Sequence, residues 1–178
     1  MNFDRAKFKT LVHYICDRSA DPQRLGAVKL NKILWFSDMF HFAETGTPLT
    51  GESYVKQQRG PVPRHVLETL RELQRDGSLA VREPEFGGAC REFFSLKKPA
   101  LDQFTAEQIS LVDRLLSEIC NNHTARSISE ATHDALWEMA ATGEEIPYEA
   151  FLAFNLRGDV DEDDVRWARA ELADAAGH

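Results

Sequence analysis

Two polar side chains one helical turn apart are the sequence's best candidates for chemistry. Asp38 and His41 lie at positions i and i+3 of a segment with helical periodicity, so they share one face. A carboxylate beside an imidazole suits general acid–base catalysis, and His133 from a later segment would complete a hydrolase site. However, a buried helix commonly keeps one polar stripe that hydrogen-bonds loop backbone. We therefore expect these groups to be scaffolding, and a metal-free hydrolase is the least favoured function.

Other familiar catalytic and ligand-binding patterns are missing from the sequence. It contains no H-E-x-x-H, no H-x-H and no Cys/His cluster for a metal, and no G-x-x-x-x-G-K-[ST] or G-x-S-x-G motif. Gly87-Gly88 falls between two expected strands and not before a helix. We therefore expect no cofactor, no metal and no enzymatic activity. Cys16, Cys90 and Cys120 are odd in number and far apart, which predicts reduced thiols.

Length and charge indicate one ordered domain with an acidic second half. The chain has 178 residues, of which 43% are hydrophobic and 28% charged, which suits a single hydrophobic core. Residues 99–178 hold seventeen Asp and Glu against five Lys and Arg. Such a half repels nucleic acid, and it suits either a basic partner or a solvated surface. No apolar run reaches the length of a membrane span and no signal-peptide pattern appears, so we expect a cytoplasmic protein.

Periodicity and turn residues predict a mainly helical α+β domain with a small β-hairpin. Expected helices cover about residues 4–19, 26–45, 63–76 and 105–122, with shorter ones opening at 127 and 147 and a last one from 161. Expected strands cover 53–57, 79–82 and 91–96, and residues 59–63 are expected to form a stiff loop. The helix over 26–45 is apolar on almost every side, which predicts a buried central element. The helix over 63–76 is expected to turn Val66, Leu67, Leu70 and Leu73 inward, and the hairpin after it is typical of a winged helix.

Two segments carry a pattern that composition does not explain. The first reads VKLNKILWFSD from Val28 and continues through a T-G step to RGPVP at 59–63, and the second reads SEATH at 129–133. Over about residues 25–148 their order and spacing resemble the Panacea domain, the SocA-like antitoxin family. That family joins a K-L-x-K-L-L-[YW]-[FL]-A-D helix and its trailing His to a G-P-V turn and a later His and Trp. The matching residues here are Lys29, Leu30, Lys32, Trp35, Phe36, Asp38, His41, Gly60, Pro61, Val62, His133 and Trp137.

The resemblance implies a compact domain with a winged-helix-like core, which we place at residues 1–154. We expect residues 155–178 to form an acidic C-terminal helix and tail that packs on this domain or extends it. The resemblance also implies the antitoxin of a bacterial or phage toxin–antitoxin pair, which neutralises a cognate protein toxin, encoded by a neighbouring gene, by direct contact. Most matching residues are expected to be structural, although Trp and Tyr are favoured anchors at interfaces. The residues expected to contact the toxin are Trp35, Tyr54, Arg59, Arg64, His65, Asp161, Asp163 and Asp164.

Two alternative functions remain open at this point. An adaptor that delivers the toxin to a cytoplasmic protease would need the same contacts. A winged-helix DNA-binding regulator would use basic residues of the helix and hairpin, namely Arg64, His65, Arg71, Arg75, Arg82, Arg91, Lys97 and Lys98. The net charge of +3 over residues 56–98 is small beside the many phosphate contacts of DNA-binding proteins. Nucleic acid is therefore the less favoured partner, and no membrane partner is expected.

Overall fold

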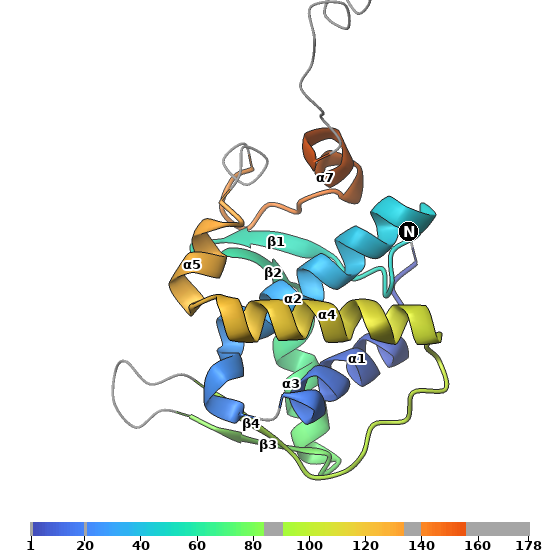
Figure 1. Cartoon of the computed structure of the whole chain (residues 1–178), viewed down its shortest axis with the longest axis vertical. Helices are drawn as coiled ribbons and strands as arrows, with labels where there is room; N and C mark the ends of the chain where they lie inside the picture. The colour runs from blue at the N-terminus through green and yellow to red at the C-terminus, as the bar shows by residue number, and fades with distance from the viewer. Residues whose placement is uncertain (1, 20, 84–90, 134–139, 156–178) are drawn as a thin grey trace, which may run out of the picture.

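The chain folds into helices packed around one central helix, with two short hairpins (Figure 1). The computed structural model describes residues 2–19, 21–83, 91–133 and 140–155. Its helices are α1 (Arg5–Arg18), α2 (Pro22–Thr45), α3 (Val66–Arg75), α4 (Ala106–Asn122), α5 (Ala125–Glu130) and α7 (Tyr148–Asn155). Its strands are β1 (Tyr54–Gln57), β2 (Gly60–Pro63), β3 (Leu79–Arg82) and β4 (Glu92–Ser95). The predicted mainly helical α+β class is confirmed.

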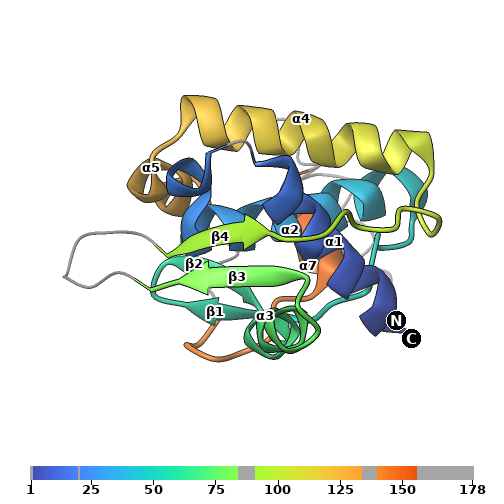
Figure 2. The same ribbon diagram turned by 90° about the horizontal axis from the view of Figure 1, so that it is seen from below.

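Helix α2 is the centre of the core, as its sequence predicts. Its side chains Leu30, Ile33, Leu34 and Met39 are fully buried. Figure 2 shows α2 between α4 on one side and the hairpins on the other, in agreement with its contacts to α4, β2 and β4. A helix covered on several sides needs an apolar surface all round, and this is why its sequence shows so little amphipathic periodicity.

The start of α2 differs from the prediction. The helix begins at Pro22 and not at about residue 26, because the Asp21 carboxylate accepts a hydrogen bond from the Gln23 N–H at 2.9 Å and Pro22 suits the first helical position. Gly26 then leaves the helical region with φ 60° and ψ 165°, so the helix restarts at Ala27. The predicted end of the helix at residue 45 is confirmed, and Gly46 follows it in the left-handed region with φ 75°.

The segment expected to be a stiff loop is strand β2. It pairs antiparallel with β1 from Gln57 opposite Gly60 to Tyr54 opposite Pro63. Alternate pairs of an antiparallel ladder exchange no hydrogen bonds, so prolines at every second position are compatible with an edge strand. Helix α3 consequently begins at Val66 and not at Pro63.

The second hairpin follows α3 as predicted. Strands β3 and β4 pair antiparallel from Leu79 opposite Ser95 to Arg82 opposite Glu92, and the expected turn at Phe86-Gly87-Gly88 lies outside the described residues. Helix α3 buries Val66, Leu70 and Leu73. The expectation that Leu67 also points inward is wrong, because its side chain lies on the solvent face of α3 with 54% exposed.

Helix α4 begins near its predicted start, whereas α5 begins earlier than predicted. At the start of α4, Thr105 and Gln108 form a capping box. The second box uses Thr124 and Ser127, so α5 starts earlier than predicted and ends before His133. Over the described ranges, no helix is long and apolar enough to cross a membrane. The thiols of Cys16 and Cys120 are buried and unbridged, and burial raises the pKa of both, whereas Cys90 lies outside the described residues.

Candidate functional site

The three side chains considered for catalysis do not meet. Asp38 is fully buried, and its described partners are residues of the loop before β1 and of β1 itself, with neither histidine among them. The ring of His41 instead contacts the Thr47 carbonyl through Nδ1 at 2.7 Å and the Gln108 amide through Nε2 at 3.0 Å. His133 lies beyond the end of α5, with Nε2 3.5 Å from the Ser129 hydroxyl. The arrangement therefore lacks the hydrogen-bonded acid–base pair that the hydrolase hypothesis requires.

Asp38 organises a closed hydrogen-bond cluster. Its Oδ1 accepts the Thr50 N–H at 2.6 Å, and its Oδ2 accepts the Thr50 hydroxyl at 2.8 Å and the Tyr54 hydroxyl at 2.6 Å. Burial raises the pKa of the Asp38 carboxyl, while these donors act in the opposite direction. The expected polar stripe that binds loop backbone is thus confirmed at Asp38, where it ties α2 to the chain leading into β1.

Two aromatic residues expected to contact the toxin belong to this core. Trp35 is 3% exposed and Tyr54 is fully buried. The Trp35 ring packs edge-on against the rings of Tyr54 and Phe151, at centroid distances of 5.0 and 5.9 Å. Side chains so covered have no surface to offer a partner, so the expectation is wrong for both. Because the helix is apolar on almost every side, its sequence does not indicate which aromatic side chains are exposed to solvent.

A second buried cluster joins α2 to β2. Lys32 is 1% exposed, its Nζ donates to the Pro61 carbonyl at 3.1 Å, and burial lowers its pKa to about 7. A Cβ at Gly60 would stand 2.3 Å from Lys32 Nζ and 2.5 Å from the Thr132 hydroxyl, and Gly60 also has φ +95°. Only glycine meets both conditions, so the matching residues Lys32 and Gly60 depend on one another.

The tip of the β1–β2 hairpin is braced by α5. The Ser129 hydroxyl donates to the Arg59 carbonyl at 3.0 Å, and the Thr132 hydroxyl donates to the Ser129 carbonyl at 2.9 Å. With the bond from Lys32 to Pro61, the tip is held from two sides. The Arg59 side chain is exposed and forms no ion pair with any residue that the structure describes. Arg59 is therefore a cation on a rigid support.

The other residues expected to contact the toxin divide into two groups. Arg64 pairs with Glu145 at 3.3 Å, and His65 Nδ1 lies 2.9 Å from the buried carboxylate of Glu52. Asp161, Asp163 and Asp164 lie outside the described residues, as does Trp137 of the family pattern. Of the predicted contact residues, Arg59 is the exposed cation that no described carboxylate neutralises.

Most cations considered for DNA binding are already engaged. Arg82 pairs with Glu92, Arg91 with Glu83, and Lys98 with Asp17, while the Lys97 ammonium donates to the Asp76 carbonyl; Arg64 and His65 have the carboxylate partners given above. Arg71 and Arg75 are exposed without an ion pair to a described residue. Neutralised cations release few counterions from a nucleic acid, which weighs against the DNA-binding alternative.

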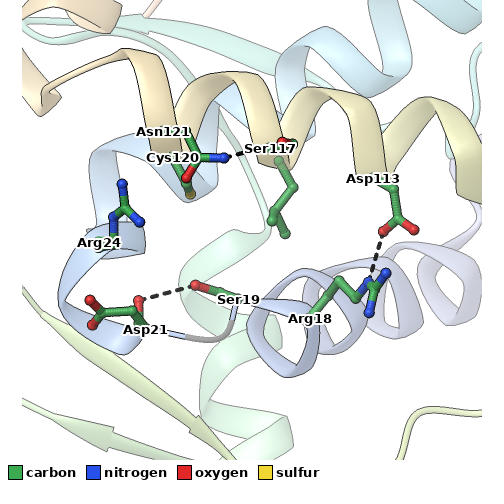
Figure 3. A pocket seen from close by; sticks show the side chains of 9 residues that line it. Arg18, Ser19, Asp21, Arg24, Asp113, Ser117, Cys120 and Asn121 are labelled. Atoms are coloured by element: carbon green, nitrogen blue, oxygen red, sulfur yellow. Dashed lines mark hydrogen bonds and ion pairs between the residues drawn. The ribbon is translucent and has the colours of Figure 1, made fainter.

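Two surface hollows are lined in part by residues of α4. Figure 3 shows one of about 260 Å³, between the end of α1, the start of α2 and α4, where Arg18 pairs with Asp113 at 3.3 Å and Arg24 extends toward α4. Another, of about 650 Å³, lies between His41 and the start of α4. Within the described part of the chain, no three His, Cys, Asp or Glu side chains are grouped to hold a metal ion.

Several residues of these clusters carried little signal in the sequence. Thr50, Ser129 and Thr132 stand inside the matching segments. The hydroxyls of Thr50 and Ser129 bond to distant partners on α2 and the hairpin, and the Thr132 hydroxyl lies against Gly60. Glu52 is buried, accepts hydrogen bonds from Ser53 and His65, and receives the Tyr148 hydroxyl on its carbonyl at 2.6 Å. A charged residue between Gly and Ser reads as surface loop, so sequence reasoning missed it.

The fold and the clusters define a compact α+β domain whose matching residues brace a hairpin against its central helix. A family model described as antitoxin SocA-like, Panacea domain, matches residues 30–138. Because this match covers more than half of the chain, the protein belongs to the SocA-like Panacea family, and the predicted resemblance is confirmed. Neither a search of curated proteins nor one of solved structures returned a match. Membership indicates an antitoxin role and, in general, a toxin as partner.

Proposed function

We propose that this chain neutralises a cognate protein toxin, the product of a neighbouring gene, by binding it directly and covering its active surface. The family match over residues 30–138 is the observation that carries the proposal. The separation of Asp38, His41 and His133 supports a binding role, because a catalytic role would require groups that converge on a substrate. Neutralisation by contact requires only an exposed, well-ordered surface.

The tip of the β1–β2 hairpin is the part of that surface we propose to contact the toxin. Arg59 is exposed there, and the backbone of the tip is held by the hydrogen bonds from Ser129 to the Arg59 carbonyl and from Lys32 to the Pro61 carbonyl. A preordered loop loses little conformational entropy on binding, so more of the contact energy remains as affinity. Arg64 and His65 lie at the opposite end of β2 and extend the proposed surface.

The acidic residues beyond the described part of the chain are proposed as a second contact. Asp161, Asp163 and Asp164 belong to a half of the chain with strong negative charge, which suits a basic toxin surface. Reversing these three charges is expected to slow association with the toxin and to weaken its dependence on salt. Unchanged neutralisation by this variant would remove the acidic segment from the mechanism.

The direct test is growth of cells that express the neighbouring gene alone and together with this chain. We expect arrest in the first case, recovery in the second, and co-purification of the two proteins. A harmless neighbour, or recovery without a complex, would contradict direct neutralisation. Toxin half-life is measured in the same cells, because a toxin that disappears when this chain is present would indicate delivery to a protease in place of masking.

Single charge reversals locate the contact. Arg59→Glu is expected to abolish recovery of growth, whereas Arg71→Glu is expected to leave it intact. Both arginines are exposed and lack an ion pair with a described residue, so the two variants change net charge equally. Equal loss in both variants would mean that net charge, and not the hairpin tip, determines neutralisation.

A further inference from the structure

An open hollow lies where the start of α2, the tip of the β1–β2 hairpin and α5 meet. It consists of two lobes of about 420 and 540 Å³ that share Val28, Arg59 and Ala125 in their walls. In Figure 1 the first turns of α2 lie between α5 and β4, and Figure 2 shows the same arrangement from below. We call this two-lobed region the basic hollow.

Positive charge gathers in the basic hollow although the whole chain carries a net charge of −8. The cations in its walls are Arg24, Lys29, Arg59, Arg91 and Arg126, and the carboxylate in its walls is Glu130. Arg91 is paired with Glu83 at 2.8 Å. Arg24, Arg59 and Arg126 form no ion pair within the described ranges. Like charges that outnumber the nearby counter-charges repel one another, and a bound anion would relieve that repulsion.

One of these cations is buried in the wall and only partly satisfied. Lys29 is 8% exposed, and its ammonium donates a long hydrogen bond of 3.4 Å to the Cys120 carbonyl. An ammonium carries three N–H donors, so further acceptors can bind it. The helix restarts at Ala27 after the kink at Gly26, which directs the positive end of its dipole toward the same lobe.

The distribution of the charges over two lobes indicates the chemistry of the ligand. Phosphate sites gather backbone N–H groups and cations around one point. Here the arginines are distributed over two lobes, with the apolar side chains of Val28 and Ala125 between them. This pattern suits a chain that presents separate carboxylates at intervals. We propose that the basic hollow binds an acidic peptide segment of the toxin, an inference that rests on the proposed antitoxin function.

The test uses the full chain and a fluorescein-labelled octaglutamate peptide, with binding measured by fluorescence anisotropy. The double variant Arg59→Glu/Arg126→Glu is expected to bind the peptide at least about tenfold more weakly than the wild type. The control Arg71→Glu/Arg75→Glu makes the same change in net charge on α3 and is expected to stay within about twofold. Circular dichroism melting curves of all three proteins confirm that each is folded.

Several results would overturn this assignment. They are no binding by the wild type, equal weakening in the control variant, tighter binding of inorganic pyrophosphate than of the peptide, or binding that appears only after removal of residues 156–178. Recovery of growth by the wild-type chain tests the antitoxin role separately. Recovery without peptide binding contradicts only the acidic-segment proposal, whereas peptide binding without recovery contradicts only the antitoxin role.

Discussion

The two halves of α2 hold buried charges in opposite ways. Toward its end, Asp38 accepts three hydrogen bonds at 2.6 to 2.8 Å, and both Asp38 and Tyr54 are fully buried. Nearer its start, Lys32 and Lys29 are also buried, but each ammonium donates one described hydrogen bond, at 3.1 and 3.4 Å. One helix thus carries a fully satisfied carboxylate at one end and partly satisfied cations at the other.

The way in which each buried charge is satisfied indicates what its end of α2 does. A buried carboxylate whose acceptors are used stabilises the fold, whereas a desolvated ammonium with one acceptor costs free energy. Burial of Lys32 carries this cost, and its ammonium donates to the Pro61 carbonyl at the hairpin tip, near the exposed Arg59. We infer that the Asp38 end of α2 maintains the domain and that the Lys32 end presents the surface for the partner.

The largest expected effect is at the Asp38 end. Asp38→Ala removes the acceptor of the Thr50 N–H and hydroxyl in the core and leaves the Tyr54 hydroxyl only the Leu34 carbonyl at 2.8 Å, so we expect the free energy of unfolding to fall by about 3–5 kcal/mol. Tyr54→Phe, which removes a single hydroxyl, is the milder control and is expected to cost about 1–2 kcal/mol. Urea denaturation followed by circular dichroism measures both. A loss below about 1 kcal/mol for Asp38→Ala would show that water reaches the donors of this cluster.

A smaller loss is expected where the hairpin tip meets Lys32. Gly60→Ala combines an unfavourable φ of +95° with a clash against Lys32 and Thr132, so we expect a loss of about 2–4 kcal/mol. Gly46→Ala separates the two causes, because Gly46 has φ +75° with nothing within 4 Å of the added Cβ. That control is expected to cost about 1 kcal/mol. Equal losses would mean that the close approach of Lys32 is unimportant.

The pH dependence of stability tests the cost of burying Lys32. Its pKa is lowered from 10.5 to about 7, so the unfolded chain binds more protons than the folded chain between these values. The contribution of Lys32 to the free energy of unfolding therefore rises as the pH increases from 7 to 10.5. This gain is lost as the pH falls back toward 7. Lys32→Met is expected to flatten this slope and to raise stability at pH 6 by about 1–3 kcal/mol. Lys98→Met, at an exposed lysine, is the control and should leave the slope unchanged.

The smallest effect on stability is expected at the proposed partner surface. Arg59→Glu changes an exposed side chain with no described ion pair, so the free energy of unfolding should stay within about 0.5 kcal/mol of the wild type. Thermal melting of this variant beside Arg71→Glu provides the measurement. A loss near that of Gly60→Ala would assign Arg59 to the scaffold.

Much of this architecture follows from local sequence signals. The periodicity of α1 and α4, the capping box at Thr105 and the stop at Gly46 depend on neighbours within a few residues, so a single sequence reveals them. The scaffold role of Asp38 also follows, because a buried polar group needs partners.

The sequence names Arg59 as a contact residue, but the hydrogen bonds that support the hairpin tip could not be predicted in the same way. The bond from Ser129 to Arg59 spans seventy residues, and the bond from Lys32 to Pro61 spans twenty-nine. Such contacts arise from tertiary packing, which periodicity does not encode. Trp35 is misassigned for the same reason. Tryptophan is common at interfaces, but tertiary packing places this one in the core.

The most direct test is the affinity of the full chain for the purified toxin, measured by titration calorimetry for Arg59→Glu and Tyr54→Phe at a temperature where both are folded. The separation of the two ends of α2 predicts that Arg59→Glu binds at least about tenfold more weakly with unchanged stability. Tyr54→Phe should bind within about twofold of the wild type although it is less stable. Wild-type affinity in Arg59→Glu, together with lost binding in folded Tyr54→Phe, would contradict the assignment of scaffold and partner surface to opposite ends of α2.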